Sequence, residues 1–204
     1  VDEALGQAVP VQLVDPAEFG DVTDTVTSQG VVAIATMPTQ PSLADFARSS
    51  PTLIAVAVAA ADPGNVGTLI RIADAAGADG VILASGSCDP YNGKAVRAST
   101  GSLFHLPVIT GVSFDQVRAG LPSDSWQFLA TTGSAEVELF SRELRELMTT
   151  PTAWVFGNEA HGLDAEVVSA CELAVRIPIF GQAESLNVGA AAAVCLYASA
   201  TAKR

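Results

Sequence analysis

The stretch LIAVAVAAADPGNVGTLIRIADAAGADGVILA, residues 53–84, decides the fold of this chain. Leu53–Ala59 is a continuous run of small and β-branched apolar residues, which is typical of a strand covered on both faces. Val66–Ala76 carries apolar residues at helical spacing, and Gly77 suits the C-terminal cap of that helix. Gly80–Ala84 has the pattern of the next strand. A strand, a helix and a second strand in this order predict two parallel strands joined by a crossover helix.

The same alternation continues to the end of the chain. Further strands are expected at 107–110, 126–130, 153–156 and 173–177, and also ahead of the stretch, at 30–35. Further helices are expected at 92–100, 113–119, 141–148, 164–170 and 186–202. The pattern predicts an α/β fold with a mostly parallel sheet and helices on both of its faces.

Composition excludes several classes of protein. The 204 residues are 49% hydrophobic, enough for one domain with a sizeable core. A net charge of −12 argues against a general binder of polyanions, so a nucleic-acid partner needs a local basic patch, a second subunit or a further domain. The three cysteines lie far apart, which disfavours disulfides and zinc and favours a reducing cytoplasm. No stretch has the length and apolar character of a membrane span.

The chain divides into a short leading segment and a main domain. Residues 1–28 are mixed in character, and we expect them to be an entry linker or the end of a preceding segment. Residues 29–204 are expected to form the functional domain. Because the chain starts at Val1, we expect the natural N-terminus to lie upstream.

Three polar segments follow expected strands and lead toward expected helices. They are Asn65–Arg71, Gly157–Leu163, and Ile177–Ile179 with Ser185–Gly189. Because ligands bind at the carboxyl ends of strands in open α/β sheets, we expect these segments to form one polar site. Taken singly, each polar residue has a structural explanation: Asn65, Ser185 and Asn187 as helix caps, and Glu159 as a charge that offsets a helix dipole.

Other chemistries have no support in the sequence. The glycine-rich signatures of dinucleotide and nucleoside-triphosphate binding are absent, as is the Gly-x-Ser-x-Gly nucleophile elbow. His105 and His161 have no second ligand at metal spacing, so no metal site is expected.

Taken together, the segments resemble the SpoU (TrmH-like) family of RNA 2′-O-ribose methyltransferases in the SPOUT superfamily. The matching motifs are Asn65-x-Gly67-x-x-x-Arg71, Gly157-x-Glu159-x-x-Gly162-Leu163, and Ile177-Pro178-Ile179 through Ser185-Leu186-Asn187-Val188, with a weaker match at Lys94 to Gly101. The resemblance covers about three-quarters of the chain, from residue 50 to residue 204, and the ordered set of motifs is specific although each motif alone is weak. Gly189 departs from the family pattern, where serine is frequent.

The resemblance implies a fold and a reaction. It implies a C-terminal trefoil knot, a homodimer, and S-adenosyl-L-methionine as the donor of a methyl group to a ribose 2′-hydroxyl of structured RNA. It also implies that residues 1–28 are the end of an N-terminal RNA-binding domain or its linker. This linker-like segment favours ribosomal RNA over transfer RNA.

The resemblance also assigns roles to residues. Residues implied in catalysis are Arg71, Asn65, Glu159, Ser185 and Asn187. Residues implied in donor binding are Gly157, Ile177, Leu186, Thr131, Gly133 and Ile179. Arg97 and Lys94 are candidates for contact with RNA.

Two alternatives remain open from the sequence. One is a non-catalytic RNA- or ligand-binding dimer on the same fold. The other is an acidic α/β protein whose polar strand ends only cap helices. Donor binding without turnover would favour the first, and absence of donor binding would favour the second.

Overall fold

The computed structural model describes residues 6–7, 9–19, 30–121 and 124–204. The chain forms two compact units, residues 1–37 and residues 38–204. The first unit contains the short helix α2, Pro16–Phe19. The strand expected at 30–35 is wrong: these residues have no regular secondary structure and are exposed. No described strand of that unit lies beside them to complete a ladder of hydrogen bonds, which a strand needs. The proposed domain boundary after residue 28 stays a prediction.

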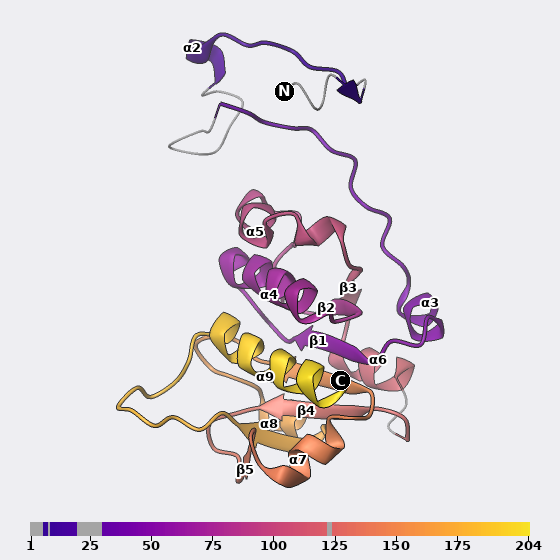
Figure 1. Cartoon of the computed structure of the whole chain (residues 1–204), viewed down its shortest axis with the longest axis vertical. Coiled ribbons are helices and arrows are strands. Elements are labelled where there is room, and N and C mark those ends of the chain that lie inside the picture. The colour runs from indigo at the N-terminus through magenta and orange to yellow at the C-terminus, as the bar shows by residue number, and fades with distance from the viewer. Residues whose placement is uncertain (1–5, 8, 20–29, 122–123) are drawn as a thin grey trace. The chain divides into compact units, whose positions relative to one another are not determined.

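A parallel sheet forms the centre of residues 38–204 (Figure 1). Seven strands are described, in the order β3-β2-β1-β6-β4-β7-β5, and every pair is parallel. The strands are β1 (Leu53–Ala57), β2 (Gly80–Ala84), β3 (Val108–Val112), β4 (Gln127–Thr131), β5 (Val137–Glu138), β6 (Thr152–Phe156) and β7 (Leu173–Arg176). The predicted parallel sheet is therefore confirmed, and β5 is a two-residue edge strand that periodicity does not reveal.

Helices connect the strands. They are α3 (Leu43–Arg48), α4 (Pro63–Ala76), α5 (Gly93–Ser99), the 3-10 turn η2 (Ser102–Phe104), α6 (Phe114–Gly120), α7 (Arg142–Leu147), α8 (Ala165–Ser169) and α9 (Val188–Ala202). The expected C-terminal cap of α4 is confirmed, since Gly77 has a φ of 73° and lies in the left-handed region that favours glycine. Ser141 caps α7 as expected.

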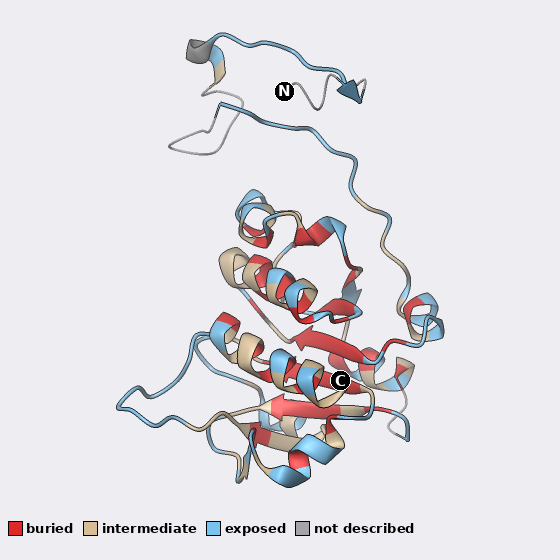
Figure 2. Ribbon diagram, in the orientation of Figure 1, coloured by how far each residue is buried: buried red, intermediate tan, exposed pale blue. Residues whose placement is uncertain are grey.

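Alternate residues of the strands face two separate cores. Leu53, Ala55 and Ala57 of β1 pack with α4, α7 and α9, whereas Ile54 and Val56 pack with α3 and α6. The expected helices on both faces of the sheet are therefore confirmed. Strands β1, β2 and β6 are buried throughout, whereas the outer faces of the helices are exposed (Figure 2).

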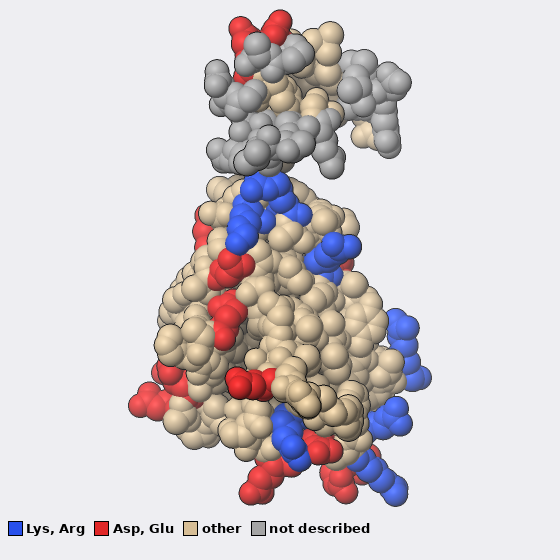
Figure 3. Space-filling view, turned by 90° about the vertical axis from the view of Figure 1, so that its left-hand side faces the viewer, with Lys and Arg blue, Asp and Glu red and all other residues tan. Residues whose placement is uncertain are grey.

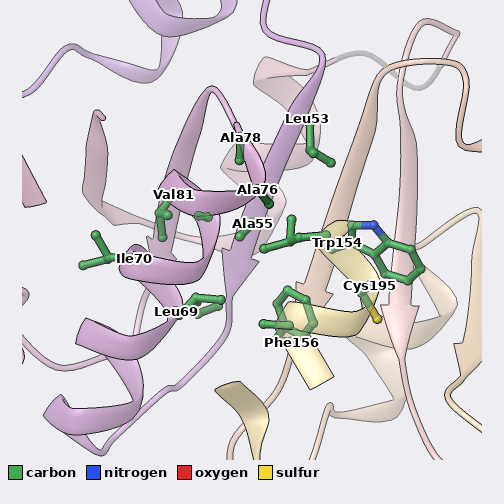
Figure 4. Close-up of a cluster of buried hydrophobic side chains, with 14 of the residues drawn as sticks. Leu53, Ala55, Leu69, Ile70, Ala76, Ala78, Val81, Trp154, Phe156 and Cys195 are labelled. Atoms are coloured by element: carbon green, nitrogen blue, oxygen red, sulfur yellow. The ribbon is translucent and has the colours of Figure 1, made fainter. Parts of the chain in front are cut away.

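The larger core is closed by a tryptophan of the central strand β6. Trp154 lies beside Cys195 of α9 (Figure 4), and its indole Nε1 donates a 2.8 Å hydrogen bond to the buried Ser199 hydroxyl. This bond satisfies the one polar atom of the indole and fixes α9 against the sheet. No helix in the described part of the chain is long and apolar enough to cross a membrane.

Candidate functional site at the carboxyl ends of the strands

The sheet order brings the three polar segments together. Strand β6 lies between β1 and β4, and β7 follows β4, so the carboxyl ends of all four strands are neighbours. The segments after β1, β6 and β7 are those that carry the motifs. The expectation that distant segments converge at one end of the sheet is confirmed.

These segments enclose a cavity of about 520 Å³. All six residues implied in donor binding line it, together with three of those implied in catalysis: Thr131, Gly133, Gly157, Ile177, Ile179, Leu186, Glu159, Ser185 and Asn187. Phe156, Leu163 and Val188 add apolar surface. A cavity of this size, lined by polar and apolar groups in similar measure, suits a molecule the size of a nucleoside derivative.

Gly157 is required by the close packing of the loop after β6. A Cβ atom on Gly157 would overlap the carbonyl of Gly162 and lie 2.6 Å from the Leu163 nitrogen. The loop folds back on itself here, because Asn158 and Gly162 exchange two backbone hydrogen bonds of 3.0 and 2.8 Å. Any side chain at 157 would push this loop into the cavity or away from the sheet.

Asn65 joins the polar residues from the other two segments. Its Nδ2 donates to Glu159 Oε1 at 2.9 Å, and its Oδ1 accepts from Asn187 Nδ2 at 3.2 Å. Asn187 also caps α9, because its Oδ1 accepts from the Gly189 nitrogen at 2.8 Å. Three segments far apart in sequence are thus tied by one amide side chain.

Two of the structural explanations for these residues are wrong. Asn65 does not cap α4: it is the third residue of that helix, and the cap is Asp62. Ser185 does not cap α9, because that helix begins at Val188 and its cap is Asn187. Glu159 lies in the loop before α8 and accepts from Asn65 in the first turn of α4, so the dipole explanation for Glu159 stays a prediction. The cap explanation holds for Asn187.

Arg71 lies outside the cavity. Thr68, one turn earlier on α4, lies next to Gly189 of α9, and the carbonyl of Ala75, one turn later, accepts a 3.3 Å hydrogen bond from Tyr197. Arg71 therefore lies along the seam between α4 and α9, where its side chain is exposed. Within the described residues its guanidinium makes no hydrogen bond or ion pair, and neither does the hydroxyl of Ser185.

The two candidates for RNA contact behave differently. Arg97 is exposed on α5 and has no ion-pair partner among the described residues. Lys94 is engaged, since its Nζ donates to Asp62 Oδ2 at 2.6 Å. On the face shown in Figure 3, basic and acidic side chains lie in small separate groups on a broad uncharged surface, so no continuous basic surface is visible there.

Sequence reasoning missed two residues that shape the site. Asp62 accepts from the Asn65 nitrogen at 2.9 Å and so begins α4. Asn158 donates to the Ala59 carbonyl at 2.9 Å, which ties the loop after β6 to the loop after β1. The Asp-Pro pair at 62–63 is a recognisable helix start, and reading it as such would have identified the cap.

The cysteines and acidic groups offer no further reactive centre. Burial raises the pKa of the Cys171 thiol to about 12 and raises that of Cys195 as well, so both thiols stay protonated and unreactive. All three cysteines are free. In the part of the chain that the structure describes, no three His, Cys, Asp or Glu side chains are grouped as a metal site would need.

Comparison with known proteins gives two family matches. The sequence model of the SpoU rRNA Methylase family matches residues 52–197. The model described as RNA 2'-O ribose methyltransferase substrate binding matches residues 1–41.

Individual relatives agree with this match. The chain is 38% identical over 186 residues to the 23S rRNA (guanosine(2553)-2'-O)-methyltransferase RlmP of Bacillus subtilis, which covers 88% of the chain and 68% of the relative. It is 39% identical to the 23S rRNA (uridine(2479)-2'-O)-methyltransferase of Streptomyces viridochromogenes over 66% of the chain and 47% of the relative.

Solved structures share the fold. The SpoU methyltransferase AviRb from Streptomyces viridochromogenes, in complex with AdoMet, has a TM-score of 0.66 and 36% identity over 73% of this chain. An AdoMet-bound rRNA methyltransferase from Sinorhizobium meliloti has a TM-score of 0.69 and 32% identity over 79% of it. The chain spans 59% and 60% of the length of these two structures. These fold neighbours imply the trefoil knot.

Proposed function

Because this chain belongs to the SpoU rRNA methylase family, we propose that it transfers a methyl group from S-adenosyl-L-methionine to a ribose 2′-hydroxyl of ribosomal RNA. The observation that carries the proposal is the 520 Å³ cavity at the strand ends, with Asn65, Glu159 and Asn187 joined beside it. The names of the relatives support ribosomal over transfer RNA. Because the proposed substrate is ribosomal RNA, we also propose a cytoplasmic location.

The residues of the cavity fit the donor. S-adenosyl-L-methionine would supply an electrophilic methyl group on a sulfonium. Ile177, Ile179 and Leu186 form an apolar slot suited to the adenine, and the backbone of this segment offers hydrogen-bonding groups at its edge. Gly157 permits the close approach of the loop that closes the other side. Thr131, whose hydroxyl donates to the Val155 carbonyl at 2.9 Å, keeps the end of β4 in place beside Gly133.

Asn65 and Ser185 orient the acceptor nucleotide in this proposal. Ser185 lines the cavity with a free hydroxyl, and Asn65 is held in one orientation by Glu159 and Asn187. Fixing the attacking oxygen in line with the methyl group removes much of the entropic cost of the reaction, which can amount to several kcal/mol.

Arg71 stabilises charge on the acceptor oxygen. The 2′-hydroxyl loses its proton as it attacks, so negative charge develops on that oxygen. A guanidinium is always protonated in proteins and is a poor base. We assign Arg71 the electrostatic role, while an RNA phosphate takes the proton. Arg71 is exposed and has no partner within the part of the chain that the structure describes, so it is available to RNA at the seam between α4 and α9.

RNA is held by local groups, because a net charge of −12 opposes general attraction. Arg97 is exposed on α5, which packs against α4, and has no ion-pair partner in the described part of the chain, so we assign it to an RNA phosphate. Residues 1–28 are the end or linker of an RNA-binding domain in this proposal, which the substrate-binding match to residues 1–41 supports.

A homodimer completes the proposal. Helix α9 is apolar on its outer side as well as its inner side, and Tyr197 there is 50% exposed. An apolar helix face of this kind is typical of a subunit interface. The second copy packs on this face, beside the seam that carries Arg71. Sedimentation of the wild type and of Tyr197→Glu tests it: a monomer in both would contradict the dimer.

Titration calorimetry with S-adenosyl-L-methionine, followed by methylation assays on ribosomal RNA, tests the function. We expect saturable donor binding, and ribose methylation that nuclease digestion and mass spectrometry locate on a 2′-oxygen. Donor binding without turnover on any ribosomal RNA would favour the non-catalytic dimer. No donor binding by the folded protein would overturn the proposed enzyme.

A further inference from the structure

Asp62 binds two partners with its two carboxylate oxygens. Oδ1 accepts the backbone N–H of Asn65 at 2.9 Å, and Oδ2 accepts the ammonium of Lys94 at 2.6 Å. The Lys94 hydrogen bond, followed by that from Asn65, lowers the pKa of Asp62 below its usual range. The carboxylate is therefore ionised at neutral pH and fixed between the first turn of α4 and helix α5.

These bonds continue into the site. Asn65 donates to Glu159 and accepts from Asn187, and Asn187 caps α9. Lys94 on α5 thus holds Asp62, Asp62 holds the backbone of Asn65 at the start of α4, and the side-chain amide of Asn65 bonds to the loop after β6 and the start of α9. Lys94 is the only one of these residues that comes from α5.

The ion pair lies where helices α4 and α5 pack closely together. A Cβ atom on Gly64 would lie 2.8 Å from Asp62 Oδ1 and 3.0 Å from Lys94 Cε, so the pair fills the space that a side chain at 64 would need. Behind it, a Cβ atom on Gly67 would overlap the Ala95 carbonyl and lie 2.7 Å from Ala98 Cβ. Helices α4 and α5 are therefore in backbone contact next to the pair, and the position of one determines that of the other.

We propose that Lys94 is a positioning residue for Asn65, acting through Asp62, and that it does not contact RNA. The proposal rests on the methyl transfer proposed above, since it gives Lys94 a part in that reaction. The pair does little for stability, because Asp62 and Lys94 side chains are 43% and 57% exposed and such pairs contribute little to folding. Its consequence lies in the orientation of Asn65, whose two amide atoms both carry bonds into the site.

Replacing Lys94 by Met and by Arg separates positioning from RNA contact. With saturating RNA and donor, Lys94→Met should lower the single-turnover rate roughly tenfold, because a small displacement of an orienting group has a large effect on rate. Donor affinity and the salt dependence of RNA affinity should be unchanged, and Lys94→Arg should recover most of the rate. Asp62→Asn keeps a capping side chain but loses the charge. Asp62→Asn should lower the single-turnover rate by a similar factor. The double variant Lys94→Met/Asp62→Asn should have a rate no lower than that of either single variant.

Two comparisons make the result decisive. Arg48→Met breaks an exposed Asp–Arg pair on α3 and should change none of these quantities. Arg97→Met should reduce the slope of log affinity against log salt by about 0.7 to 0.9, the effect of one lost phosphate contact. The proposal is overturned if Lys94→Met reduces that slope in the same way and leaves the saturated rate intact.

Nuclear magnetic resonance tests the positioning of Asn65 without any methylation assay. If the wild type does not methylate RNA, the proposed function fails, and the positioning is then judged from the side-chain amide resonances of Asn65 in ¹H–¹⁵N spectra. These resonances should shift in Lys94→Met and stay unchanged in Arg48→Met. Unchanged Asn65 resonances in Lys94→Met would overturn the positioning role whether or not methylation is observed.

Discussion

The two ends of the parallel sheet use the same kinds of side chain for opposite purposes. At the amino ends, polar groups close the structure: Asp79 Oδ2 accepts the backbone N–H groups of Thr52 and Leu53 at 2.7 and 3.0 Å, and Glu172 accepts that of Phe128 at 2.7 Å. At the carboxyl ends, Asn65 and Glu159 bond to other side chains and border a cavity.

The difference lies in what each polar group bonds to. A carboxylate that accepts backbone N–H groups satisfies strand ends and needs no ligand. A cluster in which side chains orient one another at the edge of a cavity, where the Ser185 hydroxyl has no partner among the described residues, holds polar atoms ready for a molecule that is not part of the chain. Changes at the carboxyl ends should therefore affect chemistry, and changes at the amino ends should affect stability.

Arg71→Ala should show the largest effect, a loss of about 10²- to 10³-fold in single-turnover rate, as expected for removing a charge-stabilising group. Donor affinity should be unchanged, because Arg71 does not line the cavity. Arg71→Lys should not restore the rate, since an ammonium lacks the planar fork of a guanidinium. Rapid-quench assays measure the rate; near-normal turnover by Arg71→Ala would refute its role.

Gly157→Ala should weaken donor binding by at least about tenfold, which corresponds to a loss of about 1.4 kcal/mol. The added Cβ would overlap the Gly162 carbonyl, so the loop that borders the cavity must move. Calorimetry with S-adenosyl-L-methionine measures the change. Gly181→Ala is the matched control, because Gly181 does not line the cavity and a Cβ there meets no atom within 4 Å. Equal affinities for the two variants would contradict the role of this loop.

Glu172→Ala, at the amino ends, should lower the free energy of unfolding by about 2 kcal/mol and leave donor affinity unchanged. It removes the 2.8 Å ion pair with Arg118 and leaves the Phe128 N–H without its acceptor. Urea denaturation measures the stability. Glu146→Ala breaks the exposed pair with Arg142 and should change stability by less than about 0.5 kcal/mol. A loss of donor affinity in Glu172→Ala would contradict the claim that changes at the amino ends of the strands affect stability alone.

Asp74→Asn should have the smallest effect, confined to acid stability. Hydrogen bonds from Ser102 and then His105 lower the pKa of Asp74, so the folded state favours its ionised form. The resulting stabilisation is present above the pKa of the unfolded chain, about 3.9, and is lost as the pH falls through the lower folded value. The variant should therefore lose less stability than the wild type as the pH falls below about 4. Denaturation midpoints from pH 6 to pH 2.5 measure this; parallel curves would contradict it.

Much of the architecture was predictable from local sequence. Continuous apolar runs such as Leu53–Ala57 identify buried parallel strands, and Gly77 and Ser141 identify helix ends, because these signals depend on neighbouring residues alone. The strand expected at 30–35 failed for the complementary reason: its apolar residues have strand propensity, but a strand forms only where a partner strand is available. The edge strand β5 pairs through its backbone with β7 and is too short to show a period.

The site was predictable only as a set of residues. Motif resemblance identified Asn65, Glu159 and Asn187, and fold topology brought their segments to one edge. That Asn65 bonds to both of the others, and that Asp62 rather than Asn65 caps α4, depends on how the first turn of α4 is oriented. A one-residue shift of that helix start would rotate Asn65 by about 100° away from the site.

Local residue patterns were enough to predict six of the seven described strands, the apolar faces that bury the sheet, and the family to which the chain belongs. The tertiary structure alone decided that Lys94 bonds to Asp62, that Arg71 lies on the seam between α4 and α9 outside the cavity, and that Ser185 lies within it. The reason is the distance along the sequence between the residues that interact. Secondary structure follows from interactions between near neighbours, whereas each of these placements depends on helices and loops that meet only when the sheet has assembled.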